Sequence, residues 1–488
     1  MHITMKRSLI WLLFLTVSFT THAQSYLSLD SCRSLALANN KELLIENKKI
    51  EAAHFQRKSA FTKYLPSLSA TGTYMRNSKE FSLLSTDQKN LFGGLGTTLT
   101  TPIQQAGAII GQKFPELAPI LNGFIGGIEE GINGVGQSVI DAMRTDTRNI
   151  YAGAVSLTQP LYMGGKIRAY NKITKYAEEL AHQQQQSGMQ EVILSTDQAY
   201  WQVVSLTNKH KLAKSYANLL QELDDNVQKM IAEGVATKAD GLTVRVKLNE
   251  AEMTLAKVED GLSLSRMLLC QLCGLDLSSE IVLADEEMDD LAVAAVNPMF
   301  DMTQVYANRP EVRCLEIAQK IHQQKVNVER SEHLPSLALM GNYIISNPSV
   351  FNSFENKFKG MWNVGVMLKI PLLNWGGGIY KVKAAKAEAC IAQYKLEDAK
   401  EKIELQVNQA AFKVNEASKK LTMALKNEEK AEENLRFAEL GFKEGVIPTT
   451  NVLEAQTAWL SAQSEKIDAQ IDVKLTEIYL QKSLGTLN

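Results

Sequence analysis

The residues Leu65-Pro-Ser-Leu-Ser-Ala-Thr-Gly-Thr-Tyr74 recur later in the chain as Leu334-Pro-Ser-Leu-Ala-Leu-Met-Gly-Asn-Tyr343, with six identities in ten positions. In both stretches, apolar or aromatic residues alternate with small or polar ones. A period of two is typical of a β-strand, because successive side chains of a strand point to opposite faces of the sheet. Each copy of this stretch therefore predicts a strand with one apolar face.

Two further stretches, Tyr151–Thr158 and Trp362–Ile370, have the same alternation. A run of about ten alternating residues with an aromatic residue near one end suits a tilted transmembrane strand. A half-buried strand of a soluble sheet has the same pattern, so the strands alone leave both interpretations open.

The matches continue beyond the strands at a second offset. The first pair of stretches is 269 residues apart, whereas Val155–Leu161 corresponds to Val366–Leu372 at 211 residues. Glu233-Gly-Val235 corresponds to Glu444-Gly-Val446 at the same 211 residues. Such self-similarity indicates a duplicated structural unit. The drop in offset assigns 58 additional residues to the first copy.

The duplication predicts a division of the chain into four segments. We expect a signal peptide at residues 1–23, a first repeat at 24–275, an inter-repeat linker at 276–301 and a second repeat at 302–488. Each repeat would hold a helix, two strands and a long helical hairpin. The first repeat also carries an insertion at about 75–149, which its apolar residues favour as short helices over the mouth of a pore, or as a contact with lipid or another protein.

The N-terminus indicates export. Lys6 and Arg7 precede an apolar run over residues 9–19, and Thr21-His-Ala23 supplies small residues before Gln24. A charged start, a short apolar core and small residues at a cleavage site define a secretory signal peptide. The alternative, a membrane anchor, needs a longer apolar run.

Two long stretches predict helices. None of the 11 prolines lies within 161–297 or 372–447, and residues 166–231 and 379–442 are rich in Ala, Glu, Lys, Gln and Leu. These residues favour helix formation, and at 1.5 Å per residue such helices extend roughly 100 Å. Helices of this length need partners for their apolar stripes, so we expect coiled-coil packing.

Four strands per chain cannot close a barrel, and an open strand edge in lipid would leave backbone groups unpaired. We therefore expect a mixed α and β membrane protein whose barrel is shared between copies. Three copies would supply twelve strands.

Other functional classes lack support in the sequence. A net charge of −2 leaves no basic surface for nucleic acid, and the chain has no phosphate-binding loop, zinc-protease or serine-hydrolase motif. We expect neither catalysis nor a cofactor or metal. Cys270-Gln-Leu-Cys273 has the spacing of a zinc or redox site, but it lies in an apolar helical run, so buried small residues are the favoured interpretation.

The duplicated order of these motifs resembles the TolC family of outer-membrane efflux proteins. The shared features are the Leu-Pro-Ser-Leu strand entry, a Pro-Leu followed by glycines after the next strand, and paired helix returns beginning Gly-Val. The resemblance implies a homotrimer in which a twelve-stranded β-barrel in outer-membrane lipid continues into a helical periplasmic tunnel. It also implies two partners, a periplasmic adaptor protein and an inner-membrane transporter.

By the same resemblance, the helix returns are the tips that meet the adaptor. Their candidate contact residues are Gly234, Val235, Thr237, Gly445, Val446 and Pro448. Glycine can end a helix and Thr, Asp or Asn can begin the next one. Family members often carry two acidic residues three apart at the second tip, lining the constriction of the tunnel. Here these positions are Asn451 and Glu454, and Asp240 matches Asn451 in the first copy. Three Glu454 carboxylates around one axis would attract cations; a solvated helical residue is the alternative.

The expected function is an outer-membrane exit duct for efflux or secretion of small molecules or polypeptides. A periplasmic coiled-coil adaptor without a channel is the alternative. The choice of cargo is expected to lie mostly with the inner-membrane pump, so the sequence identifies no cargo.

Overall fold

The computed structural model describes residues 25–80, 84–144, 146–287, 300–349, 351 and 355–487. The expected signal peptide and residues 288–299 of the expected linker lie outside the described residues. The chain divides into two compact units. The helical unit comprises Met1–Arg57, Lys172–Lys325 and Ala384–Asn488, and the strand unit comprises Lys58–Asn171 and Val326–Lys383. Each unit therefore takes segments from both sequence repeats.

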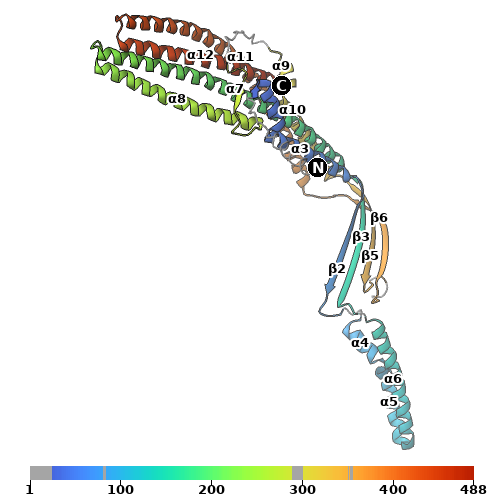
Figure 1. Ribbon diagram of the computed structural model, residues 1–488. Helices are drawn as coiled ribbons and strands as arrows, with labels where there is room; N and C mark the ends of the chain where they lie inside the picture. Colours follow the sequence, from blue (N-terminus) through green and yellow to red (C-terminus); the bar gives the residue numbers. More distant parts are fainter. Residues whose placement is uncertain are drawn as a thin grey trace, which may run out of the picture. The chain divides into compact units, whose positions relative to one another are not determined.

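The strand unit contains an antiparallel sheet of four strands in the order β2-β3-β5-β6 (Figure 1). Their bounds are Ser67–Arg76 for β2, Asn149–Met163 for β3, Ser336–Asn347 for β5 and Lys359–Lys369 for β6. All four predicted strands are confirmed. The alternation of apolar and small residues allows each strand to have two chemically different faces.

The insertion between β2 and β3 is helical, as one of the alternatives from the sequence proposed. It forms α4 (Thr86–Gly93), α5 (Leu95–Lys113), the 3₁₀ turn η1 (Pro115–Leu117) and α6 (Ala118–Ala142). The expectation of short helices was wrong for α6, which has 25 residues. Ser85 begins α4 with a capping box, in which its hydroxyl and the Gln88 side chain exchange hydrogen bonds with each other's backbone N–H.

Long helices dominate the helical unit. The first repeat supplies α2 (Leu29–Asn39), α3 (Lys41–Thr62), α7 (Lys166–Ala232) and α8 (Lys238–Cys273). The second repeat supplies α9 (Met302–Asn308), α10 (Pro310–Ser331), α11 (Gly377–Lys443) and α12 (Thr449–Leu484). The predicted helices 166–231 and 379–442 match α7 and α11 to within two residues at each end. The parts of α3, α7, α10 and α11 beyond the bounds above belong to the strand unit.

The two hairpins of the helical unit, α7–α8 and α11–α12, lie side by side (Figure 1). Helix α12 contacts α7 through the ion pair of Lys209 and Asp468, whose charged atoms are 2.6 Å apart. It contacts α11 through Lys420 and Asp472, at 2.8 Å. The four helices therefore run in the order α8-α7-α12-α11, with α8 and α11 at the flanks.

Two short strands were not predicted from the sequence. Strand β1 (Ser25–Leu27) pairs in parallel with β4 (Ile281–Leu283), which lies inside the segment expected to be a plain linker. Leu27, Ile281 and Leu283 are buried in the same apolar cluster as Cys270 and Cys273. The burial of both cysteines confirms that the Cys-x-x-Cys stretch consists of small core residues.

Candidate functional site

The first helix return ends α7 through a glycine in the left-handed region. Gly234 has φ 76°, which glycine adopts without a steric penalty. The Val235 N–H donates to the Met230 carbonyl at 2.8 Å, and the Gly234 N–H donates to the Ile231 carbonyl at 3.1 Å. These two bonds satisfy the last carbonyls of the helix, as in a Schellman motif. The predicted role of Gly234 as a helix end is confirmed.

The same return begins α8 with Thr237 as its cap. The Asp240 N–H donates to the Thr237 hydroxyl oxygen at 3.2 Å, and the Thr237 N–H donates to an Asp240 carboxylate oxygen at 2.9 Å. The hydroxyl itself donates to that carboxylate at 2.6 Å. These bonds hold the pKa of Asp240 below its usual range. Asp240, a candidate constriction residue, thus has a local structural partner in this chain.

The second helix return has the same end but a different start. Gly445 has φ 73°, and the Val446 N–H donates to the Gly441 carbonyl at 2.8 Å. Pro448 lies in the turn and precedes α12 without a side-chain cap, because proline can start a helix but offers no side-chain acceptor. The interpretation of Asn451 as a helix cap was therefore wrong, since Asn451 already lies within α12.

The candidate constriction residues Asn451 and Glu454 lie on the exposed face of α12. The residues between and beside them, Val452, Leu453 and Ala455, are buried. Val452 and Leu453 join the α7–α8 hairpin in one apolar cluster, which brings the two tips together within the chain. The tips also expose Val235 (69%) and Val446 (79%), two apolar side chains that nothing in the described chain covers well.

A cavity of about 170 Å³ lies between α7, α11 and α12 near the tips. Glu439 of α11 and Glu222 of α7 line it, together with Lys443 and Gln456. Burial, and secondarily the Glu222 carboxylate, raises the pKa of Glu439, while Lys443 and Gln456 act in the opposite direction. The sequence offered no signal for this pair, because the two carboxylates come from helices in different repeats.

We predict that Glu439→Gln raises the melting temperature of the protein at pH 7–8 by about 2–4 °C. A carboxyl whose pKa is raised by folding stabilises the folded state while it is protonated, and that contribution is lost as pH rises through the raised pKa. The gain should shrink toward pH ~4.5, near the ordinary pKa of Glu. The exposed Glu433→Gln serves as control; equal pH profiles for the two variants would contradict the prediction.

Strand register places every strand's apolar residues on the same face of the sheet. Leu68 pairs with Leu157, Leu157 with Gly341, and Gly341 with Val364. The residues two positions along continue this apolar face: Ala70, Val155, Tyr343 and Trp362. The other face is lined by small and polar residues: Ser69, Thr71, Thr73, Ser156, Asn342 and Asn363. One apolar and one polar face is the arrangement of a sheet between lipid and a water-filled lumen.

Aromatic residues mark both ends of the apolar face. At one end the rings of Tyr74 and Tyr151 are 4.9 Å apart between centroids, and Phe358 lies 6.2 Å from Tyr151. Beyond the other end, the segment after β6 exposes Leu372 and Trp375. Aromatic girdles at both membrane interfaces are typical of transmembrane β-sheets. None of the described helices is long and apolar enough to cross a membrane.

The model of the "Outer membrane efflux protein" family matches residues 131–275 and 302–486, which together are more than half of the chain. The chain belongs to the outer membrane efflux protein family. The matched segments contain both helix returns and strands β3, β5 and β6. The resemblance inferred from the duplicated motifs is thus confirmed.

Known proteins of similar sequence and fold support the assignment. The alkaline protease secretion protein AprF of Pseudomonas aeruginosa is 22% identical over 365 residues, covering 72% of this chain and 75% of AprF. The outer membrane protein TolC of Vibrio cholerae is 22% identical over 351 residues, covering 70% of this chain and 78% of TolC. The crystal structure of the Campylobacter jejuni CmeC outer membrane channel superposes with a TM-score of 0.71 at 15% identity, over 94% of this chain and 86% of CmeC.

This outer membrane efflux protein is therefore an exit duct of the outer membrane for efflux or secretion, with a large periplasmic part. Its relatives are channel proteins rather than enzymes. The alternative function, an adaptor without a channel, was wrong.

Buried charges in the helical unit of this efflux protein were missed by the sequence analysis. Arg33 of α2 donates to both carboxylate oxygens of Asp197 of α7, at 2.7 and 2.6 Å, and Asp197 is fully buried. Burial raises the pKa of Asp197, and the Arg33 guanidinium opposes that shift. The two residues are 164 positions apart, so no local pattern could have paired them.

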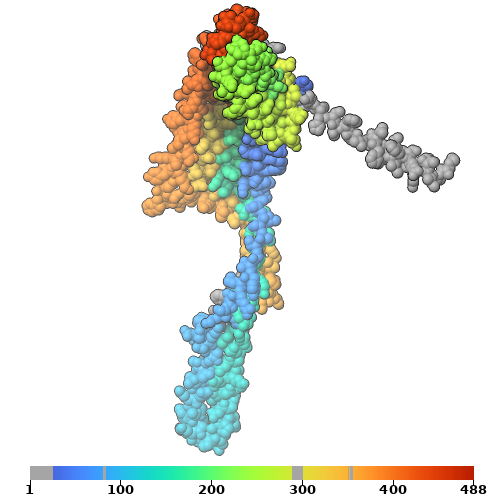
Figure 2. All heavy atoms as spheres, turned by 60° about the vertical axis from the view of Figure 1, so that its left-hand side comes forward, coloured from blue at the N-terminus to red at the C-terminus, as the bar shows by residue number. Residues whose placement is uncertain are grey.

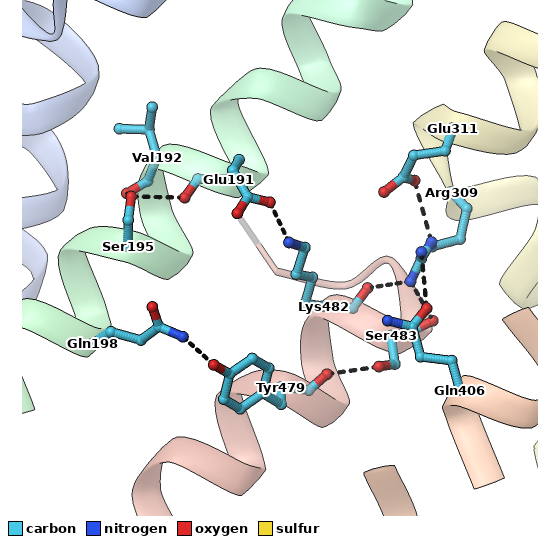
Figure 3. Close-up of polar contacts among 10 residues, drawn as sticks. All are labelled: Glu191, Val192, Ser195, Gln198, Arg309, Glu311, Gln406, Tyr479, Lys482 and Ser483. Atoms are coloured by element: carbon cyan, nitrogen blue, oxygen red, sulfur yellow. Dashed lines mark hydrogen bonds and ion pairs between the residues drawn. The ribbon is translucent and has the colours of Figure 1, made fainter. Parts of the chain in front are cut away.

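A second polar junction joins elements of both repeats (Figure 3). Arg309, which is buried, donates to the carbonyls of Lys482 and Ser483 at the end of α12, both at 3.0 Å. The Lys482 ammonium in turn pairs with Glu191 of α7. These bonds fasten the C-terminal end of α12 to α7 and to the start of α10.

Proposed function

We propose that three copies of this chain form the duct, with their sheets joined into a twelve-stranded β-barrel and their helices into a periplasmic tunnel. The observation that carries the proposal is the pair of open sheet edges. Among the described residues, β2 pairs only with β3, and β6 only with β5. In lipid these edges would leave a row of unpaired backbone groups, so β2 of one copy should pair with β6 of the next.

The flanks of the helical unit support the same closed ring. Helix α8 exposes Leu242, Val246, Met253 and Leu264, and α11 exposes Leu405, Phe412 and Met423. Within each set the spacings are 4, 7 or 11 residues, which place the side chains along one stripe of a helix. A ring in which α8 of one copy packs against α11 of the next would bury both stripes in coiled-coil contacts.

We also propose that the chain arose by internal duplication, with repeats at 24–275 and 302–488, a linker at 276–301 and a signal peptide at 1–23. Matching contacts support it. A Cβ atom added to Gly274 would lie 2.4 Å from the Asn39 side chain, and one added to Gly485 would lie 2.9 Å from the Asn308 backbone. These glycines and asparagines correspond to each other at the offsets of 211 and 269 residues.

The constriction of the duct is proposed to include Glu454, Asn451 and Asp240. Glu454 and Asn451 project from a face of α12 that the rest of the described chain leaves exposed. In a trimer, three Glu454 carboxylates around the axis would attract cations and repel one another. Asp240 has a weaker case, because its carboxylate already caps α8.

This arrangement predicts that Glu454→Ala raises single-channel conductance in planar bilayers and weakens block by trivalent cations by about tenfold, or ~1.4 kcal/mol. Removing three carboxylates removes the main attraction for a multivalent cation. The matched control is Glu432→Ala on α11, an exposed Glu outside the proposed constriction. Unchanged block in Glu454→Ala would exclude Glu454 from the constriction, and a wild-type protein without channels would contradict the duct itself.

The tips are proposed to contact a periplasmic adaptor through Gly234, Val235, Thr237, Gly445, Val446 and Pro448, and the adaptor to link the duct to an inner-membrane transporter. Val235 and Val446 support this proposal because large exposed apolar side chains mark interaction surfaces.

Val446→Asp should reduce adaptor crosslinking in cells by at least about tenfold, because it buries a charge in the contact. Ser461→Asp, an exposed position three turns along α12, should leave crosslinking unchanged. Trimers should persist in both variants; equal crosslinking in the two would remove the second tip from the adaptor site.

A further inference from the structure

The helical insertion of the strand unit is a hairpin with an internal contact made by glycines. A Cβ atom added to Gly96 of α5 would lie 2.3 Å from the Glu129 carbonyl oxygen of α6. One added to Gly136 of α6 would lie 1.9 Å from the Phe92 carbonyl oxygen. Where the helices of this insertion touch, glycine therefore permits the close backbone approach that small residues allow at helix crossings.

Other glycines of α6 have no such neighbour. For Gly123, Gly127, Gly131 and Gly134, an added Cβ would meet nothing within 4 Å among the described residues. Their spacings of four, four and three residues place them along one side of the helix. Ile120, Phe124 and Val135 lie on the same side and are exposed. This side of α6 is shaped for a close helix contact, and the described chain does not supply one.

Helix α5 extends this surface. Leu99, Ile103 and Ile110 recur at helical spacing and are exposed, and Phe114 and Leu117 continue them at the turn between the helices. We call these side chains, together with the exposed side of α6, the apolar face of the insertion. The strands of the same unit do not cover it (Figure 2). Its large side chains expose on the order of 900 Å², comparable to the ~800 Å² that each partner buries in a stable interface.

Charge is kept away from the apolar face. The acidic residues of α6 are Glu129, Glu130 and Asp141, and Lys113 is the single charged residue of α5. Glu129 accepts hydrogen bonds from Thr97 and Gln104, at 2.7 and 2.9 Å, and so lies toward the polar side of the hairpin. A neutral apolar surface can pack against an identical surface without repulsion between like charges.

We propose that the apolar face packs against the same face of a second copy of this chain, so that neighbouring insertions form a helical bundle. The proposal rests on the trimer proposed above. Because β2 is an edge strand that would pair with the next copy, its insertion would be delivered beside the insertion of that copy. Tethering of this kind raises the effective concentration of the two surfaces.

The tether is short and held at its base. The Asn77 N–H, directly after β2, donates to the Arg148 carbonyl at 2.7 Å, directly before β3. Glu80 pairs with Arg144 and Arg148, at 3.1 and 3.5 Å. The insertion therefore leaves the sheet through a clamped neck, which limits how far its apolar face can lie from that of the neighbouring copy.

The proposal is tested by cysteine crosslinking of full-length protein in outer membranes. In a Cys390→Ser background, which removes the exposed native thiol, Gly127→Cys places a thiol on the apolar face. Gly126→Cys is the matched control, an exposed glycine of the same helix on the polar side. Under mild oxidant, Gly127→Cys should form disulfide-linked dimers at least about fivefold faster than Gly126→Cys, because only the former is held beside its equivalent.

A second measurement separates the possible occupants. The Gly127→Cys thiol should be protected from a membrane-impermeant maleimide, and Gly126→Cys should react. Native trimers with equal crosslinking of the two variants would overturn the inference while leaving the duct proposal intact. Protection of Gly127→Cys without crosslinking would overturn it in favour of lipid or another protein. Loss of trimers in the unmodified chain would instead count against the proposed assembly.

Discussion

Val366→Arg is expected to remove most of the protein from the outer membrane. Val366 of β6 is exposed on the apolar face of the sheet, opposite Leu339 of β5. An arginine on the lipid face near the middle of a transmembrane strand costs about 2–4 kcal/mol. In a trimer each barrel would contain this substitution three times, so the total cost would be comparable to the stability of a whole domain.

The neighbouring residue provides the control. Met367 pairs with Ala338 and points to the opposite, lumen-facing side, so Met367→Arg should leave membrane levels within about twofold of wild type. Outer-membrane fractionation and gel migration without heating would measure amount and assembly. If Met367→Arg were lost and Val366→Arg retained, the two faces would have been assigned the wrong way round.

Arg33→Met is expected to give the largest loss of stability in the helical unit. It leaves the fully buried Asp197 carboxylate without its guanidinium partner. Breaking a buried ion pair in this way costs about 3–5 kcal/mol. Lys420→Met removes a pair with Asp472 in which both side chains are 47% exposed, so it should cost no more than about 1 kcal/mol.

Two further measurements identify the cause. Burial already raises the pKa of Asp197, and loss of Arg33 should raise it further. The Arg33→Met defect should therefore shrink as pH falls and Asp197 takes up a proton. The double variant Arg33→Met/Asp197→Leu should recover much of the melting temperature, because an apolar pair carries no desolvation cost. A defect that is independent of pH and not rescued would show that packing of the Arg33 stem matters more than its charge.

Local features of the fold could be predicted because their causes are local. Alternation with a period of two predicted four strands, and proline-free, helix-favouring stretches predicted α7 and α11. Gly234 and Gly445 were correctly interpreted as helix ends, because a left-handed residue at that place favours glycine. The apolar surroundings of Cys270 and Cys273 predicted their burial.

Features that depend on distant partners were missed. Strands β1 and β4 have three residues each, too few for any periodicity, and they form because Leu27 and Ile281 share a core. The carboxylates of Glu222 and Glu439 meet because two hairpins pack together. Asn451 looked like a helix cap, but the chain enters α12 at Pro448, so Asn451 already lies inside the helix.

The sequence by itself determined that this protein has a duplicated plan, four two-faced strands, two long helical hairpins and the helix returns at their tips. Each of these follows from propensity and periodicity within a few consecutive residues. Only the tertiary structure decided the strand register, which gathers Leu68, Leu157, Gly341 and Val364 onto one face. It also decided the pairing of Arg33 with Asp197 and the apolar face of the insertion. The reason is physical: a sequence pattern specifies which side of an element is apolar, but the partner of that side is chosen by packing across the whole chain.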